Sequence, residues 1–350
     1  MERMDSGMPF LLRYENVAWY EDGKVRILDR RVYPTEIRFA ECRDYRQVAQ
    51  AITDMVTQSA GPYTAVGMGM ALAAHQVRGE SRERQTAFLT QAARELANAR
   101  PTAANRYGQI TRRCAALAEA ALESGSDPVE AIVEDTLASL DRRYRIMQQV
   151  GDNLETLIPE NGAILTQCYG ETVIGALIRA AKRRGKRFRA FCAETRPYLQ
   201  GARLTASCFA EMGIDTTVLT DNMVACTMER GDIDLFTSAA DTITRDGHIA
   251  NKVGTLQIAI LADYFSLPYY VTGIPDEDKR TGADIVIEMR DPAQVLRYRD
   301  IPTTLPQVKA VYPAFDVVPP RLITGVVTDR GVLAPHRLED YFADGRRDFY

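Results

Sequence analysis

The spacing of apolar residues along the chain changes near residue 158. Before that point apolar side chains recur at helical spacing, first over residues 44–56, behind Asp44 as a helix N-cap. The same spacing continues through residues 71–79, 84–99, 103–125 and 127–154. Ahead of the helices, residues 11–23 and 24–34 meet at Asp22-Gly23, a hairpin turn signal, and residues 35–42 predict another strand. The first half is therefore expected to be mainly helical, with a small β unit.

After residue 158, short apolar runs alternate with helical segments. The predicted strands are residues 162–168, 187–194, 215–220, 234–241, 268–273 and 283–288. The predicted helices are residues 172–185, 199–213, 221–231 and 251–266. Apolar strands separated by helices are typical of a parallel sheet that is covered on both faces. The expected fold class is α/β, with a mainly helical domain over residues 1–150 and a parallel-sheet domain over residues 151–350.

Polar side chains gather where these predicted strands end. Cys168 follows the first strand, residues 194–203 follow the second, Asp221-Asn222 follow the third, and Asp241 follows the fourth. In doubly wound sheets, ligands bind beyond the carboxyl ends of the strands. The sequence therefore predicts a small-molecule site at this edge of the sheet.

Composition narrows the class of protein. Of the 350 residues, 46% are hydrophobic, which excludes wholesale disorder. The net charge is −4, and the densest basic patch, residues 182–187, lies at a predicted helix end, so a nucleic-acid partner is not indicated. No signal peptide and no apolar run of about 18 residues is present, so neither a membrane partner nor export is expected, and we expect a cytoplasmic protein with reduced thiols.

Neither a metal nor an organic cofactor is expected. The six cysteines are scattered without a CxxC pair and there are only three histidines, so ligand clusters for zinc are missing from the sequence. No GxGxxG follows a predicted strand, and "GMGM" (residues 67–70) lies in a helical run, where it predicts close helix packing.

Several motifs, in this order, resemble one enzyme family: "ETRPYLQGARLTA" (194–206), "TDNM" (220–223), "AAD" (239–241) and "ANKVGT" (250–255). They are similar to those of S-methyl-5-thioribose-1-phosphate isomerases. That family is related to ribose-1,5-bisphosphate isomerases and to regulatory subunits of the translation-initiation guanine nucleotide exchange factor. "ARPTAAN" (99–105) and residues 312–331 extend the resemblance over most of the chain.

The resemblance implies a helical N-terminal domain, a Rossmann-like C-terminal domain, a homodimer and an enzyme of methionine salvage. It implies a sugar 1-phosphate substrate that is converted from aldose to ketose. The implied catalytic residues are Cys168 in "TQCYGE" and Asp241 in "SAAD". The implied phosphate ligands are Arg100, Gln200, Asn251 and Lys252.

The residues themselves leave other interpretations open. A free cysteine such as Cys168 is usually a small buried apolar residue, and Asp241 could cap the following segment. Arg100 could be a surface cation, and Lys252 could be a solvated side chain at a helix start. Catalysis would need Asp241 as a shielded, protonated acid, and Cys168 as a thiolate favoured by nearby donors. The hydrogen could move by a proton relay or by a hydride shift.

The chain departs from the family pattern at two places. Gln58 lies near the position of an arginine in the family's RGAP-type motif, so one phosphate-binding charge is missing there. The segment after Cys168 is short and contains Glu171. The substrate could therefore be methylthioribose 1-phosphate or a related 5-deoxy-pentose 1-phosphate. The competing hypothesis is a non-catalytic sugar-phosphate or nucleotide sensor that acts by assembly.

Overall fold

The computed structural model describes residues 3–100 and 104–343, and these form two compact units. The first unit ends at Arg145 and the second begins at Ile146, within one long helix, α5 (Pro128–Leu157). Among the described residues, none of the helices is both long enough and apolar enough to cross a bilayer.

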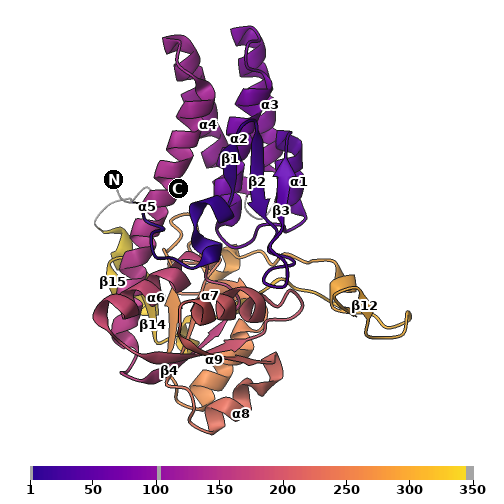
Figure 1. Ribbon diagram of the computed structural model, residues 1–350. Coiled ribbons are helices and arrows are strands. Elements are labelled where there is room, and N and C mark those ends of the chain that lie inside the picture. The colour runs from indigo at the N-terminus through magenta and orange to yellow at the C-terminus, as the bar shows by residue number, and fades with distance from the viewer. Residues whose placement is uncertain (1–2, 101–103, 344–350) are drawn as a thin grey trace. The chain divides into compact units, whose positions relative to one another are not determined.

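The first unit combines a small antiparallel sheet with a group of helices (Figure 1). Its strands are β1 (Trp19–Glu21), β2 (Lys24–Leu28) and β3 (Phe39–Cys42). Asp22 and Gly23 connect β1 to β2 with φ of 46° and 72°, as expected for a two-residue hairpin turn. Its other helices are α1 (Tyr45–Thr53), α2 (Gly61–Gln76), α3 (Arg82–Ala97) and α4 (Ala104–Ser124).

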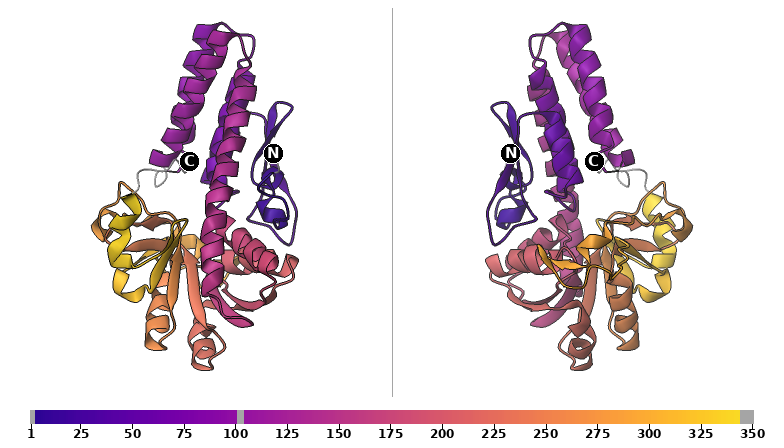
Figure 2. Two further views of the ribbon diagram at one scale, coloured as in Figure 1. Left: turned by 90° about the vertical axis from the view of Figure 1, so that its left-hand side faces the viewer. Right: turned by 90° about the vertical axis from the view of Figure 1, so that its right-hand side faces the viewer.

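Glycines let α2 pack closely within this unit. A Cβ on Gly67 would lie 2.4 Å from Thr136 Oγ1 of α5, and one on Gly69 would lie 3.1 Å from side chains of Val48 and Leu96. The residues of α2 from Thr64 to Ala74 are buried all round the helix, and α2, α3 and α4 pack against one another (Figure 2). The prediction that "GMGM" serves helix packing is confirmed.

The second unit is built around a seven-stranded sheet with the order β15-β14-β10-β7-β4-β5-β6. All neighbours pair in parallel except β14 and β15. The strands are β4 (Gly162–Gln167), β5 (Phe188–Ala193), β6 (Asp215–Leu219), β7 (Leu235–Ala239), β10 (Tyr269–Thr272), β14 (Gly325–Thr328) and β15 (Gly331–Leu333). The intervening helices are α6 (Thr172–Arg184), α7 (Ala206–Glu211), α8 (Val224–Glu229) and α9 (Thr255–Tyr264).

The strand order reverses between β4 and β7. The chain first moves outward from β4 to β5 and β6, then returns to place β7 on the other side of β4. Helix α6 packs against α7, and α8 packs against α9. Because parallel crossovers are right-handed, these two pairs cover opposite faces of the sheet. The crevice between β4 and β7 is the topological switch point at which doubly wound proteins bind ligands.

Two predicted elements are wrong. Residues 251–266 were expected to form a helix, but the segment starts as β9 (Ile249–Lys252), which pairs with β8 (Thr242–Ile243) and β13 (Phe315–Val318), and α9 begins only at Thr255. Residues 283–288 were expected to be a strand of the sheet, yet the first two belong to a short 3-10 turn (Gly282–Asp284) and the rest are irregular. The strand next to β10 is instead β14. A short hairpin of β11 (Arg297–Tyr298) and β12 (Ile301–Pro302) lies between these regions.

Candidate active site

The backbone is strained where β4 and β5 end. Cys168 and Glu171 after β4, and Thr195 and Leu199 after β5, have φ of 62°, 34°, 67° and 58°. Positive φ is sparsely populated by residues with side chains, and such residues concentrate at functional sites. The strained positions coincide with the polar clusters predicted from the sequence.

Hydrogen bonds from the neighbouring loop fix the backbone of Cys168. Its amide donates to Thr195 Oγ1 at 2.9 Å, and its carbonyl accepts from Thr205 Oγ1 at 2.5 Å. Both threonines are buried, whereas Cys168 is half-buried. The loop after β5 therefore positions the cysteine that follows β4.

That loop is itself clamped by Asp221, which follows β6. The two carboxylate oxygens of Asp221 accept hydrogen bonds from the amides of Thr195 and Arg196, each at 2.8 Å. Arg196 extends along the loop and donates to the carbonyls of Val295 and Arg297. Asp221 and Arg196 thus brace the loop through backbone groups.

A five-residue π-helical turn, Gly201–Thr205, continues the loop into α7. A Cβ on Gly201 would lie 1.8 Å from the carbonyl oxygen of Ala193, the last residue of β5. Only glycine permits this approach, which brings Thr205 to the carbonyl of Cys168. Single π turns inside helices are frequent at functional sites.

Cys168 lies among charged groups of both signs. Burial raises the pKa of its thiol to about 11, and Asp241 adds to the rise, while Lys252 and Arg290 oppose it. The prediction of a thiolate favoured by nearby donors is only half right, because the two cations are present but desolvation outweighs them. The thiol is therefore protonated at neutral pH in the unliganded protein.

Asp241 follows β7 by two residues and is anchored through its amide, which donates to the carbonyl of Ala250 at 2.8 Å. The sequence predicts that Ala239 and Ala240 shield its carboxylate from water. In the structure Asp241 is exposed and both alanines are only half-buried. This shielding is therefore missing, and a bound substrate would have to supply it.

Lys252 is the last residue of β9, not a solvated side chain at a helix start. It is buried, its Nζ donates to the carbonyl of Ala314 at 2.9 Å, and the same atom lies 4.5 Å from the centre of the Phe315 ring. A ring face and a carbonyl oxygen both attract the positively charged form of a lysine. Gln167, the residue before Cys168, donates to the carbonyl of Lys252 at 3.4 Å, which places Lys252 at the end of β4.

Asn251 and Gln200 differ in what they offer a ligand. Asn251 Nδ2 donates to Thr255 Oγ1 at 3.0 Å, and Thr255 also donates to Gln167, so this amide orders the start of α9. Gln200 is 4% exposed, and its side-chain oxygen is buried without a hydrogen-bond partner among the described residues. A buried polar atom without a partner is costly, so the Gln200 amide is the better placed of the two for a ligand.

Arg100 belongs to the first unit, and residues 101–103 of its "ARPTAAN" motif lie outside the described residues. Its guanidinium lies beside Tyr107, where it opposes the rise in the pKa of that phenol caused by burial. Gln58, also in the first unit, is 2% exposed, and its side chain donates to the carbonyl of Met55. Its own carbonyl accepts from Nη1 of Arg30, a fully buried arginine that sequence reasoning missed.

Other residues of the site also escaped the sequence analysis. The charge of Arg290 opposes the rise in the pKa of the Cys168 thiol, and Cys168 in turn contributes to the raised pKa of Tyr312. The signal that could have found Arg290 is a cation in a stretch of alternating apolar residues. Glu171, which the sequence places in the short segment after Cys168, is buried at the start of α6. In the described part of the chain no three metal-binding side chains cluster together.

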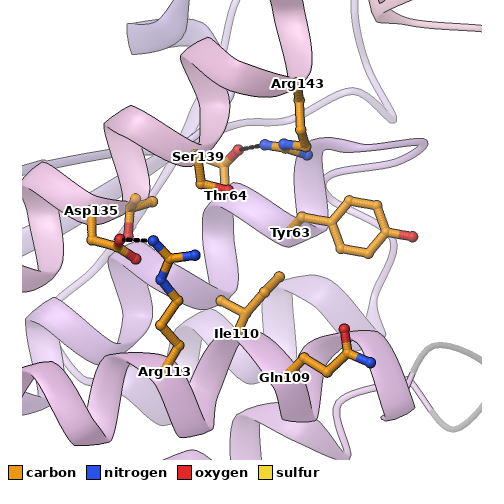
Figure 3. Close-up of a pocket in the computed structure, with 9 residues that line it drawn as sticks. Tyr63, Thr64, Gln109, Ile110, Arg113, Asp135, Ser139 and Arg143 are labelled. Carbon is orange, nitrogen blue, oxygen red and sulfur yellow. Dashed lines mark hydrogen bonds and ion pairs between the residues drawn. The ribbon is translucent and has the colours of Figure 1, made fainter. Parts of the chain in front are cut away.

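A cavity of about 140 Å³ lies within the first unit, between α2, α4 and α5 (Figure 3). Arg113 pairs with Asp135 at 2.5 Å across it, and Arg143 donates to Thr64 Oγ1 at 2.7 Å and to the carbonyl of Ala60. Its charged groups thus bind each other or nearby oxygens. The cavity is explained by helix packing and hydrogen bonding within the unit.

Comparison with known proteins agrees with this architecture. Residues 62–335 match the model of the initiation factor 2 subunit family. A methylthioribose-1-phosphate isomerase of Chloroflexus aurantiacus is 36% identical over 335 residues, covering 91% of this chain and 95% of the relative. The enzyme of that name from Desulforudis audaxviator is 37% identical, covering 94% of this chain and 98% of the relative.

Two solved structures are similar along nearly the whole chain. The 5-methylthioribose 1-phosphate isomerase of Pyrococcus horikoshii superposes with a TM-score of 0.81 at 29% identity, covering 95% of this chain and 96% of the other. The delta subunit of translation initiation factor eIF-2B from A. fulgidus gives 0.78 at 30%, covering 91% and 96%. The chain therefore belongs to the methylthioribose-1-phosphate isomerase family, within the broader initiation factor 2 subunit family.

Proposed function

We propose that the protein is an aldose–ketose isomerase that converts a 5-substituted ribose 1-phosphate to the corresponding ribulose 1-phosphate. The substrate would be S-methyl-5-thioribose 1-phosphate or a related 5-deoxy-pentose 1-phosphate. The names of its relatives support the reaction class. The observation that carries the proposal is the placement of Cys168 and Asp241 beyond two neighbouring central strands, β4 and β7, at the switch point.

The reaction requires three changes in the substrate. The bond between C1 and the ring oxygen breaks, and that oxygen takes up a proton. A hydrogen then moves from C2 to C1, and the C2 hydroxyl loses its proton as the carbonyl forms. Asp241 is proposed as the acid that protonates the ring oxygen, and as the base that takes up the final proton.

Cys168 is proposed to act on the C2 side of the sugar, by one of two routes. In a proton relay, its thiolate removes the C2 proton and returns it to C1. In a hydride shift, the hydrogen passes directly from C2 to C1 and the cysteine remains a thiol against the reacting carbons. The raised pKa of Cys168 favours the hydride route, because that route does not require the thiol to ionise.

Deuterium at C2 distinguishes these routes. A hydride shift carries the deuterium to C1 of the product, whereas a relay through a cysteine exchanges part or all of it with water. The experiment is a proton NMR assay of C2-deuterated substrate in ordinary water.

For the phosphate we propose Arg100, Gln200, Asn251 and Lys252. Lys252 supplies a buried positive charge, and the buried Gln200 supplies an amide NH₂ group that can donate to a phosphate oxygen. Charge-assisted hydrogen bonds to phosphate are strong enough to orient a small substrate. Asn251 and Arg100 already have partners, so their proposed role requires them to exchange partners on binding.

The main experiment is a proton NMR assay over a panel of pentose 1-phosphates that differ at C5. Turnover of at least one 5-deoxy or 5-methylthio substrate is the expected result. Binding without turnover of any of them would overturn the isomerase and favour a sensor that acts by assembly.

We further propose that the protein is a cytoplasmic homodimer. Large apolar side chains are exposed along the segment that contains β11 and β12, which extends from the second unit (Figure 1): Val286, Met289, Tyr298, Ile301, Leu305, Val308 and Val311. An apolar patch of this kind is typical of an interaction surface. Light scattering at micromolar concentration should give twice the chain mass, and Ile301→Ser with Leu305→Ser should lower it. Tyr264→Ser, at an exposed position on α9, is the control. Cell fractionation tests the location.

A further inference from the structure

Arg290 lies on a segment that pairs with the residues just before β13, the strand next to Lys252 of β9. Its amide donates to the carbonyl of Tyr312 at 2.9 Å, and the amide of Ala314 donates to the carbonyl of Glu288 at 2.8 Å. This short antiparallel bridge leads directly into β13, whose first residue, Phe315, pairs with Lys252 of β9. The backbone therefore brings two cations, 38 residues apart in sequence, to neighbouring positions.

Their side chains approach the same aromatic ring. The Arg290 guanidinium carbon lies 5.6 Å from the centre of the Phe315 ring, and Lys252 Nζ lies 4.5 Å from it. The guanidinium is also 5.9 Å from the ring of Tyr198, in the loop after β5. Both cations act on the Cys168 thiol. Arg290 is thus part of the same group of side chains as the candidate catalytic cysteine.

A hydrogen bond fixes the orientation of the Arg290 side chain, but not all of its N–H groups have an acceptor. Its Nε donates to Glu288 Oε1 at 2.9 Å, which fixes the plane of the guanidinium. The side chain is only 9% exposed, and Nη1 is buried without a hydrogen-bond partner of normal geometry among the described residues. The buried hydroxyl of Tyr312 lies next to the guanidinium, and the two groups shift each other's pKa, but they do not form a hydrogen bond of normal geometry and the hydroxyl has no other partner among the described residues. Buried donors without acceptors are rare and point to a ligand that supplies one.

The chemistry of this arrangement suits a phosphate. A phosphate monoester carries close to two negative charges, and of the phosphate ligands proposed within the second unit only Lys252 is a cation. An arginine whose Nε is occupied still presents its Nη groups as a fork that matches phosphate oxygens. The sugar hydroxyls of the substrate are neutral and do not require a second buried cation.

We propose that Arg290 binds the phosphate of the substrate through its Nη groups, next to Lys252, and supplies a second positive charge to it. The proposal rests on the proposed function in so far as the ligand is a sugar phosphate. Tyr312 donates its hydroxyl to the same phosphate. No step of the isomerisation passes through Arg290, which is a binding residue.

The experiment measures affinity for inorganic phosphate by calorimetry, and KM and kcat for the best pentose 1-phosphate. Arg290→Gln removes the charge, and Arg290→Lys keeps it without the fork. Arg290→Gln combined with Glu288→Gln removes both members of this ion pair and so protects the fold. Arg299→Gln, an exposed arginine on the β11–β12 turn, is the matched control. Circular dichroism melts verify that each variant is folded.

Arg290→Gln, alone and with Glu288→Gln, should weaken phosphate binding and raise KM about 10- to 100-fold, with a smaller effect on kcat. Arg290→Lys should fall between these variants and the unmodified protein, and Arg299→Gln should change neither value. Unchanged phosphate affinity in the folded double variant overturns the proposal. A fall in kcat alone, with a rate profile shifted to higher pH, also overturns it and assigns Arg290 to the Cys168 thiolate. If the unmodified protein turns over no pentose 1-phosphate but Arg290→Gln still weakens phosphate binding, the proposed function fails and the anion site stands.

Discussion

Thr166 of β4 pairs with Thr237 of β7, so the chain leaves these two strands side by side, with Cys168 one residue beyond the end of β4 and Asp241 two residues beyond the end of β7. The charge of Asp241 adds to the rise in the pKa of the Cys168 thiol, which supports the proposal that the two groups act on one ligand. A ligand held over this pair of strands meets a thiol and a carboxylate at once. The first two predictions test that arrangement.

Asp241→Asn and Cys168→Ser should each lower turnover by about 100-fold or more, the usual size of a lost acid–base contribution. Both substitutions preserve shape, so binding of the sugar phosphate should stay within about tenfold. Cys226→Ser, at the exposed cysteine of α8, is the control and should be fully active. The NMR assay gives the rates and calorimetry gives the affinities. Normal turnover by both variants would rule out this mechanism.

The pKa of Cys168, raised to about 11, predicts slow alkylation at neutral pH. Only the thiolate reacts, so the rate of Cys168 labelling by iodoacetamide should rise about tenfold per pH unit and continue to rise beyond pH 9. The Cys226→Ser background removes the exposed competitor, and peptide mass spectrometry identifies the labelled site. A plateau near pH 8 would show that the two nearby cations outweigh burial.

Gly201→Ala should damage both stability and activity. The new Cβ would overlap the carbonyl oxygen of Ala193, so β5 or the π turn must shift, at a cost of about 1–3 kcal/mol or more. The shift also moves Thr205 away from Cys168. Gly108→Ala in α4 is the control, because its Cβ would meet only the flexible end of Arg112, and it should be neutral or slightly stabilising. Urea denaturation and the rate assay report the two effects, and equal stabilities for the two variants would contradict the geometry.

Gln58→Arg should not tighten phosphate binding. Gln58 is buried and bonded to Met55, and the charge of Arg30 already lies against its carbonyl. A second buried arginine there would be crowded and repelled, which should lower the free energy of unfolding by about 1–3 kcal/mol. Denaturation and phosphate calorimetry measure the two outcomes. Tighter binding in a stable variant would show that the loop at residues 57–61 is open to the ligand.

The alternation of elements in the second unit could be predicted, because each apolar strand is separated from its helix by polar or glycine residues. Strand β9 (residues 249–252) was not predicted, and a helix was expected from residue 251, because "IANK" runs directly into an apolar helix. The break at Gly254 lies inside the motif "ANKVGT". Nothing local distinguishes such a strand from a first helical turn, and its partner, β13, is 63 residues away by the pairing of Lys252 with Phe315.

The strand ends that carry the site could be predicted from the spacing of apolar residues. The arrangement of the charged side chains around Cys168 could not. Arg290 follows a stretch, residues 283–288, that alternates like a strand, and only the bridge to Tyr312 and Ala314 turns its side chain toward Lys252. Likewise, the exposure of Asp241 depends on how β8 leaves β7, which no spacing of alanines determines. Contacts between residues far apart in sequence set both properties.

Asp221, which follows β6, accepts hydrogen bonds from the amides of Thr195 and Arg196. The conformation of the loop after β5 therefore depends on a residue that follows the next strand. The sequence of residues 194–206 is so distinctive that the segment could be mistaken for a self-contained module. Transplanted alone into another doubly wound protein, it would arrive without the carboxylate that holds two of its amides and without the carbonyls that receive Arg196. The loops after β5 and β6 therefore form one structural unit. A graft or recombination boundary placed between these two strands would separate the loop after β5 from the carboxylate that holds it.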